Sequence, residues 1–463
     1  MTLPPGPSQL PIVQTMQWSF RPMPFMEACS RRYGDIFTLR FHQLGTFVFF
    51  SRPEHIKQIF TGDTDVLLAG RANRVLEPLV GSKSVLLLDR KEHLRQRRLL
   101  MPPFHGERML AYAAIMRDTA EAEIERMPLR TPFAIHPHMQ AITLDVIMRA
   151  VFGLTSSDAP GSEGERMRRL RKLLVEFITP PPVLITFLPF TQVDLPGSPY
   201  RTFLRIRENV DRELYALIDE RRRAKDLNER EDILSLMLRA RYEDGQPMTD
   251  VELRDELVTM LVAGHETTAT SLSWAFDRIL AEPRVAKKID AELTRVLGGR
   301  RLDPAAIQGL DYIDAVIKET LRLYPILPIV ARELAAPLEI AGYSLPAGTK
   351  VVPCIYLAHR RPDTYPEPTR FYPERFIDAK IDPYAWLPFG GSVRRCLGMA
   401  FALYEMKIIL ATVLSRAHLR LASGEPARVI RRGITLAPSG GTRVILTERE
   451  PAAAREAVAQ SPA

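Results

Sequence analysis

The stretch that decides the fold of this 463-residue chain is Phe389-Gly390-Gly391-Ser392-Val393-Arg394-Arg395-Cys396-Leu397-Gly398. It places one cysteine in a glycine-rich loop, with an aromatic residue before it and arginines beside it. Glycines allow a backbone to pass close to a flat ligand, and N–H groups that follow a cysteine can hydrogen-bond its sulfur. A thiolate held in this way can bind a metal, and an arginine can bind a carboxylate of the same ligand. The alternative is a free cysteine in a turn.

This loop resembles the cysteine-ligand loop of the cytochrome P-450 superfamily, whose pattern is Phe-x-x-Gly-x-Arg-x-Cys-x-Gly. Ser392 stands where the pattern has its middle glycine. The resemblance implies that Cys396 is the metal ligand, bound to the iron of heme b (iron protoporphyrin IX), and that Phe389, Gly390, Arg394 and Gly398 lie against the cofactor. The implied fold is α+β and mainly helical: the cytochrome P-450 fold, with a long central helix over the haem and small β-sheets at the periphery.

A long helical pattern from Asp250 to about Glu282 suits that central helix. Thr249 and Glu252 have the spacing of a capping box, and Pro283 ends the pattern. At about 1.5 Å per residue, the helix would span roughly 50 Å. It is apolar on several faces, as expected of a helix that runs through a core.

The run Ala263-Gly264-His265-Glu266-Thr267-Thr268 is unusual for the interior of a buried helix. Glycine costs about 1 kcal/mol of helix stability relative to alanine, and threonine hydroxyls can bond to upstream carbonyls. The run resembles the oxygen-binding groove of cytochromes P-450. That resemblance implies that Ala263 and Gly264 contact the cofactor, and that Glu266 and Thr267 are the catalytic acid–alcohol pair that relays protons to dioxygen. The alternative is a packing seam with a satisfied hydroxyl.

The same resemblance assigns further charged residues. Four would bind the haem propionates, although each alone could be a surface charge: His93, Arg97, Arg332 and Arg394. His93 and Arg97 are four apart and share a helix face. Three others would form structural ion pairs behind the haem: Glu319, Arg322 and Arg375. Glu319 and Arg322 are three apart on the helix predicted over Asp311–Leu323, so their side chains can meet.

Five apolar residues in candidate pocket segments are predicted to contact substrate: Leu86, Met260, Leu327, Ile329 and Leu436. They favour a lipophilic small molecule such as a fatty acid, a terpenoid or a polyketide-like compound, although a core also requires apolar segments. The predicted activity is a haem-dependent monooxygenase that hydroxylates this substrate with dioxygen. The alternatives are a haem-thiolate isomerase or peroxide-driven oxidase, and a non-catalytic haem sensor or carrier.

Composition narrows the partners and the compartment. The net charge is +8 from 63 basic and 55 acidic residues, but no basic block with interleaved aromatics points to nucleic acid. The three cysteines suggest no disulfide framework, so a reducing cytoplasm is expected. The sequence contains no run of about 18 apolar residues, so no membrane span is predicted.

We expect a soluble, monomeric enzyme of the bacterial type. It would receive electrons from a separate ferredoxin or flavodoxin and an NAD(P)H reductase. Lys91, Arg95 and Arg98 could meet an acidic partner or form a solvated helix face.

Three segments are expected along the chain: a proline-rich, extended N-terminal arm (1–15), a single haem-thiolate catalytic domain (16–448) and a mobile tail (449–463). Short strands are predicted at Ile36–Phe41, Thr46–Phe50, Lys350–Tyr356 and Val429–Leu436, among others. The apolar, proline-rich stretch 179–189 is predicted to be a surface loop: an entrance lid, a patch on a membrane, or a loop packed on neighbouring helices.

Overall fold

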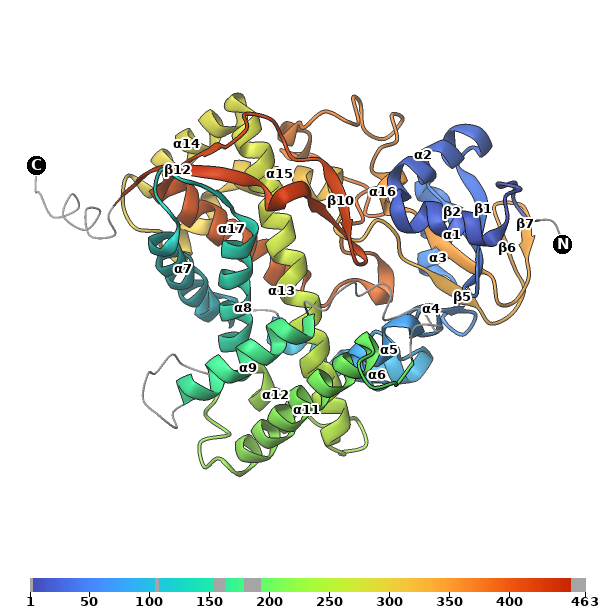
Figure 1. Cartoon of the computed structure of the whole chain (residues 1–463), viewed down its shortest axis with the longest axis horizontal. Helices are drawn as coiled ribbons and strands as arrows, with labels where there is room; N and C mark the ends of the chain where they lie inside the picture. The colour runs from blue at the N-terminus through green and yellow to red at the C-terminus, as the bar shows by residue number, and fades with distance from the viewer. Residues whose placement is uncertain (1–2, 105–107, 154–162, 179–192, 451–463) are drawn as a thin grey trace, which may run out of the picture.

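The structure, a computed structural model, describes residues 3–104, 108–153, 163–178 and 193–450. A single long helix organises it: α13 (Asp250–Ala281) crosses the middle of the molecule (Figure 1). The predicted capping box starts this helix, because the Thr249 hydroxyl accepts from the Glu252 amide and the Glu252 carboxylate accepts from the Thr249 amide. Helix α8 (His136–Phe152) packs along α13, as do α11 (Pro199–Arg223), α14 (Pro283–Leu297), α15 (Asp311–Leu323) and α17 (Met399–Arg416).

The remaining helices surround α13, as the mainly helical prediction requires. Their bounds are α1 Pro11–Phe20, α2 Pro22–Tyr33, α3 Pro53–Thr61, α4 Ala69–Ala72, α5 Glu77–Val80, α6 Arg90–Leu100, α7 Arg108–Arg126, α9 Glu163–Ile178, α11 Pro199–Arg223, α12 Ile233–Arg239, α14 Pro283–Leu297, α15 Asp311–Leu323, α16 Ile355–Ala358 and α17 Met399–Arg416. The main apolar core lies between α7, α8, α13, α15 and α17. Among the described residues, no helix combines the length and the apolar character that a membrane span needs.

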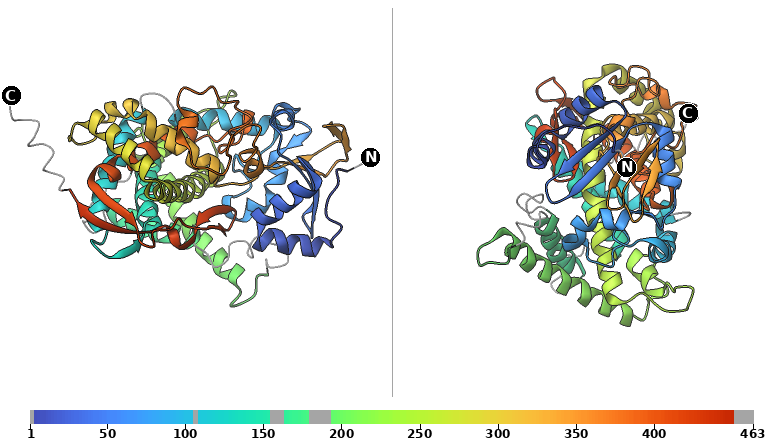
Figure 2. Two further views of the ribbon diagram at one scale, coloured as in Figure 1. Left: turned by 90° about the horizontal axis from the view of Figure 1, so that it is seen from above. Right: turned by 90° about the vertical axis from the view of Figure 1, so that its right-hand side faces the viewer.

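The strands form small sheets at the periphery. The largest has the order β1-β2-β8-β5-β3, with β1 Ile36–Phe41, β2 Gly45–Phe50, β3 Leu67–Leu68, β5 Arg332–Leu334 and β8 Lys350–Pro353. A three-stranded sheet contains β4 Pro132–Ala134, β12 Arg443–Arg449 and β9 Ala417–Leu421; two hairpins are β6 Leu338–Ile340 with β7 Tyr343–Leu345, and β10 Val429–Arg432 with β11 Thr435–Pro438. In the view from above (Figure 2, left), the N-terminal sheet lies at the opposite end of the molecule from α14. The α+β prediction is confirmed.

The N-terminal arm differs from the predicted extended segment 1–15. Only residues 3–10 are non-helical, because α1 begins at Pro11. Proline suits the first turn of a helix, where its missing N–H needs no partner and its φ is already helical. The residues before it dock on β1: the Thr38 amide donates to the Pro5 carbonyl (2.9 Å) and the Thr38 hydroxyl to the Pro4 carbonyl (2.7 Å).

Two strand predictions also need correction. The predicted strand Val429–Leu436 is a hairpin, because Gly433 adopts a φ of 64° and turns the chain between β10 and β11. The predicted strand Lys350–Tyr356 stops at Pro353, and α16 follows within two residues. The apolar stretch 179–189 lies outside the described residues, and so does the tail beyond residue 450, although Arg449 at its start still belongs to β12.

Candidate functional site

The cysteine loop turns back on itself immediately before α17. The Cys396 amide donates to the carbonyl of Phe389 (2.9 Å), and this bond closes the loop around the sulfur. The side chain of Cys396 is exposed on one side, although protein atoms surround it closely on the others. Burial raises the pKa of the Cys396 thiol, whereas the Gly398 amide and the positive charge of Arg97 act to lower it. An accessible sulfur beside an amide donor and a cation is suited to act as a thiolate ligand.

Ser392 explains why the superfamily pattern has glycine at this point of the loop. Its φ is 55°, in the left-handed region that non-glycine residues seldom adopt. Two residues earlier, Gly390 has a φ of 67°. Gly391 between them has an ordinary φ, but a Cβ atom there would lie 2.6 Å from the Phe60 ring. The loop therefore keeps the required backbone shape even though serine replaces one glycine.

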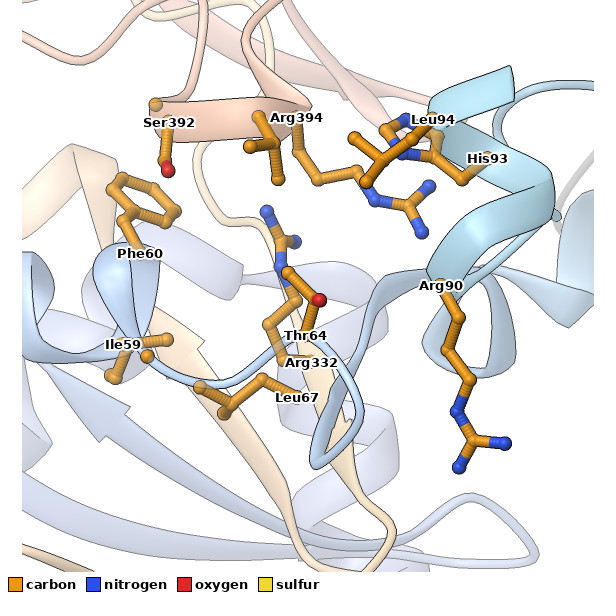
Figure 3. A pocket seen from close by; sticks show the side chains of 13 residues that line it. Ile59, Phe60, Thr64, Leu67, Arg90, His93, Leu94, Arg332, Ser392 and Arg394 are labelled. Atoms are coloured by element: carbon orange, nitrogen blue, oxygen red, sulfur yellow. The ribbon is translucent and has the colours of Figure 1, made fainter. Parts of the chain in front are cut away.

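Four basic side chains predicted to bind propionates gather beside this loop. Figure 3 shows His93 of α6, Arg332 of β5 and Arg394 of the cysteine loop around one pocket. Burial, together with the charges of Arg394, Arg97 and Arg332, lowers the pKa of His93 to about 3. Burial and the neighbouring Arg394 lower the pKa of Arg332 to about 10. His93 is therefore neutral near pH 7, whereas Arg97, Arg332 and Arg394 are mutually repelling cations that would be stabilised by a bound anion with more than one negative charge.

The one carboxylate within reach of these cations is Asp89, as far as the described residues go. Arg394 donates to its Oδ1 (2.8 Å) and also to the carbonyls of Val85 (3.3 Å) and Leu88. Burial lowers the pKa of Arg394 to about 10 despite this partner. The accessible sulfur of Cys396 and the surplus of positive charge both fit a haem, which has an iron to be ligated and two propionates.

One face of α13 carries two residues of the predicted oxygen groove, Ala263 and Thr267, together with Met260. Met260 and Thr267 are partly exposed and Ala263 is exposed, although most of the helix is buried. Their spacing of three and four residues places them on one stripe. The Thr267 hydroxyl donates to the Ala263 carbonyl (2.5 Å), so it is hydrogen-bonded to the backbone of its own helix, one turn earlier.

Glu266 lies on a neighbouring stripe of α13 and faces α8 and the β10–β11 turn. Its carboxylate accepts from the Gln140 amide (2.7 Å) and lies 3.4 Å from both the His136 Nε2 and the Arg432 guanidinium. Burial acts to raise its pKa, but His136, Arg432 and Gln140 outweigh burial and bring it to about 2. Glu266 is therefore ionised in this arrangement.

Two other residues of the motif pack against α8 instead of forming an open groove. A Cβ atom on Gly264 would lie 2.5 Å from the Ile147 side chain, so glycine here permits the close approach of the two helices. His265 is buried against the Thr143 hydroxyl (3.1 Å), and burial lowers its pKa to about 4. Contact of Gly264 with the cofactor stays a prediction.

The structure brings the three predicted ion-pair residues together in the interior. Glu319 and Arg322 are both fully buried, with a bidentate contact at 2.7 and 2.9 Å. Arg375 reaches the same carboxylate at 3.1 Å, and the Tyr372 amide also donates to it (2.9 Å). Arg322 further donates to the carbonyl of His359 (2.6 Å). Glu319 thus connects α15 to the segment that leads into the cysteine loop.

The predicted substrate contacts divide into two groups. Leu86, Met260, Leu327 and Ile329 are partly exposed and therefore have surface to offer a ligand. Leu436 is only 1% exposed, so its assignment as a substrate contact is wrong. All four residues of β11 are buried, and the strand is fixed by bonds from the Leu436 amide to Ile326 and from Trp274 to the Leu436 carbonyl.

Two of the basic residues suggested for partner binding are paired within the chain. Arg95 contacts Asp244 (2.7 Å) and lies over the Tyr242 ring, and Arg98 contacts Glu243. Lys91 is exposed.

Sequence reasoning missed Asp89 and Glu256, whose partners lie far away along the chain. Asp89 had a visible signal, because an acid directly before a helical run is typical of an N-terminal cap.

A cysteine sulfur open on one side, a cationic cluster beside it and a long central helix fit a haem-thiolate protein. The cytochrome P450 family profile matches residues 4–443. "Putative cytochrome P450 135B1" of Mycobacterium tuberculosis (strain H37Rv) is 40% identical over 468 residues, which cover 99% of this chain and 95% of that protein. "Putative cytochrome P450 138" of Mycobacterium bovis is 36% identical, covering 90% of each. The solved structure of retinoic acid-bound cyanobacterial CYP120A1 has a TM-score of 0.83 at 25% identity, covering 97% of this chain and all of that one.

The chain belongs to the cytochrome P450 family. It is therefore a monooxygenase oxidoreductase with a haem cofactor, which depends on dioxygen and on redox partners for electrons. Its fold is the cytochrome P-450 fold.

Proposed function

We propose that this enzyme hydroxylates a lipophilic small molecule, with Cys396 as the thiolate ligand of heme b. The observation that carries the assignment of the ligand is the position of Cys396: an accessible sulfur in a closed loop, next to Arg97 and the Gly398 amide. Phe389, Gly390 and Gly398 would enclose the sulfur side, and Ala263 and Gly264 the opposite side. His93, Arg97, Arg332 and Arg394 would bind the propionates.

The haem supplies the activation of dioxygen, and this chain's residues would position the substrate around it. Met260 on α13, Leu86 before α6, and Leu327 and Ile329 after α15 offer partly exposed apolar surface from separate segments. Apolar side chains without a fixed polar anchor favour a substrate that is mainly hydrocarbon. The retinoic acid bound to the structural neighbour is a lipid of this kind. A fatty acid, a terpenoid or a polyketide-like compound therefore fits best.

The carbon monoxide difference spectrum of the reduced protein tests the ligand, and titration of the ferric form tests the substrate. A strongly red-shifted Soret band supports thiolate ligation, and a low-to-high-spin shift with long-chain lipids supports the substrate class. An unshifted band would contradict ligation by Cys396 and favour a haem sensor or carrier. Product formation from peroxide alone, without dioxygen, would favour the peroxide-driven alternative.

Thr267 and Glu266 are proposed to manage the protons that dioxygen activation consumes. The Thr267 Oγ1 is on the partly exposed stripe of α13, where it can hold a proton donor close to the reaction. The ionised Glu266 carboxylate lies 3.4 Å from the guanidinium of the exposed Arg432, so it can accept protons from the surface side. To pass a proton on, the carboxylate must leave Gln140 and His136.

Thr267→Ala should bind substrate with unchanged affinity but divert electrons into peroxide, because the side chain that holds the proton donor is lost. We expect the amount of product per NAD(P)H to fall by about tenfold or more. Peroxide release and product yield, measured together, check this. Thr267→Ser keeps the hydroxyl and serves as the control. Tight coupling in Thr267→Ala would contradict the role.

Electrons are proposed to come from a separate ferredoxin or flavodoxin and its NAD(P)H reductase. The exposed Lys91 and Arg395, near the cysteine loop, could contact an acidic partner. We further propose that residues 16–448 act as a single catalytic domain, as a monomer in the cytoplasm. Cys29 and Cys354 are buried free thiols, which is compatible with a reducing compartment.

A further inference from the structure

The loop of residues 81–89, between α5 and α6, is attached to α13 by buried polar contacts. The Val85 amide donates to the Glu256 Oε1 (2.6 Å), and the Lys83 amide donates to the Asp255 Oδ2 (2.8 Å). The Thr259 hydroxyl bonds to the Ser84 hydroxyl (2.7 Å). These partners are about 170 residues apart in sequence, with a separation of 171 for Val85 and Glu256. The α13 contacts therefore fix the path of a loop that has no regular structure of its own.

Gly81 allows the backbone of the 81–89 loop to approach α13 closely. Its φ of 84° is in the left-handed region, and a Cβ atom there would lie 2.1 Å from the Asp255 carboxylate. The loop consequently begins directly on the surface of α13. Its position is set by α13 side chains rather than by a local turn sequence.

Burial of the Glu256 carboxyl group costs free energy, which points to a specific role for this side chain. Its side chain is completely buried, and its Oε1 accepts a second bond, from the Gln96 amide (3.2 Å), whose carbonyl in turn accepts from the Tyr242 hydroxyl. Its Oε2 has no hydrogen-bond partner within the described part of the chain. Burial raises the pKa of Glu256 to about 8, so the side chain is mainly neutral at pH 7. A core that needed only to be filled would be served better by an apolar side chain.

The other end of the same loop is held by the cysteine loop. Arg394 donates to the carbonyls of Val85 and Leu88 and to the Asp89 carboxylate. Val85 is therefore bonded on its N–H side to α13 and on its carbonyl side to Arg394. Leu86, the next residue, is partly exposed between these two attachments. Both sides of the proposed reaction site thus determine where Leu86 lies.

We propose that Glu256 is a positioning residue that fixes the 81–89 loop, and with it Leu86, so that the hydrocarbon part of the substrate is bound. This inference rests on the proposed lipophilic substrate. Glu256 would act through the Val85 amide, without touching the substrate, and so should affect binding much more than turnover at saturation.

Hydrogen exchange of the Val85 amide tests the attachment itself. Glu256→Met fills the same volume without an acceptor, and we expect the Val85 amide to exchange about tenfold faster in this variant. Glu256→Gln keeps the accepting oxygen and should restore slow exchange. Glu208→Met, on the exposed face of α11, is the matched control and should change nothing at Val85. If Glu256→Met fails to fold, Glu256→Ala, which leaves room for water, replaces it.

Two nitrogen ligands of the haem iron test the effect on substrate binding. Imidazole needs only the iron, whereas 1-dodecylimidazole adds a hydrocarbon tail that must occupy the substrate region. Glu256→Met should weaken 1-dodecylimidazole by about tenfold and leave imidazole unchanged, while Glu256→Gln binds both like the parent protein. The spectral shift on titration measures both affinities.

The outcomes separate this inference from the proposed function. Unchanged Val85 exchange in the Glu256 variants, or equal loss of affinity for both imidazoles, overturns the positioning role. Weak binding of the tail in every protein, including the parent, instead contradicts the lipophilic substrate, and the exchange result still decides whether Glu256 holds the loop.

Discussion

Cys396→Ala is expected to lose the red-shifted carbon monoxide band of the reduced protein completely. The loop offers one sulfur, held by the Cys396–Phe389 backbone bond and open on one side. Alanine removes the ligand and the contact between the sulfur and the Gly398 amide, but the backbone bond from the Cys396 amide to the Phe389 carbonyl is kept and still closes the loop. Thiolate ligation is what gives the iron its characteristic electron donation, so monooxygenase turnover should vanish with the band.

Cys29→Ala is the matched control for that experiment. Its thiol is buried in α2, remote from the cysteine loop in sequence, and burial raises its pKa to about 11. Such a thiol is a poor ligand, because the thiolate is the form that binds a metal. The control should keep the spectrum. An unchanged band in Cys396→Ala would refute the assignment of the ligand.

Glu319→Gln is expected to give the largest loss of stability among single polar substitutions near the site. It leaves the fully buried Arg322 without its anionic partner and removes the carboxylate shared with Arg375. Breaking a buried pair by removing one partner costs about 3–5 kcal/mol, because the remaining charge stays desolvated. Urea unfolding of the haem-loaded protein, followed by circular dichroism, measures the change in the free energy of unfolding.

Glu367→Gln provides a control with the same chemistry at the surface. Glu367 and Arg370 are also three residues apart and lie 2.9 Å from one another, but their side chains are 69% and 54% exposed. Exposed pairs contribute about 0–1 kcal/mol, so this variant should be nearly as stable as the parent protein. If the two variants lose similar stability, Glu319 does not hold the core behind the haem.

Sequence reasoning was most successful where the determinants are local. The capping box of Thr249 and Glu252 requires residues three apart, and the observed α13 starts where it predicts. The pair Glu319 and Arg322 likewise meets because of helical spacing. The cysteine loop was recognised from ten consecutive residues. Residues this near in sequence have a fixed local geometry, so such motifs can be recognised in a single sequence.

Long-range packing explains the misses. Leu436 was assigned to the pocket because its segment is apolar, but only tertiary structure decides that β11 lies inside a core. Glu256 attracted no attention, because its partner Val85 is 171 residues away and a glutamate in a helix usually faces solvent. The start of α1 at Pro11 was missed because the proline-rich run was interpreted as an extended arm, although proline also suits the first turn of a helix.

Ser392 shows that its position in the cysteine loop constrains the backbone more than the side chain. Residues with a small polar side chain, such as asparagine and aspartate, also reach the left-handed region, whereas β-branched residues strongly avoid it. At the position of Ser392, family members should therefore have glycine, serine, asparagine or aspartate, and not valine, isoleucine or threonine. A family search that demands glycine here would overlook functional members, and one written in terms of allowed φ would keep them.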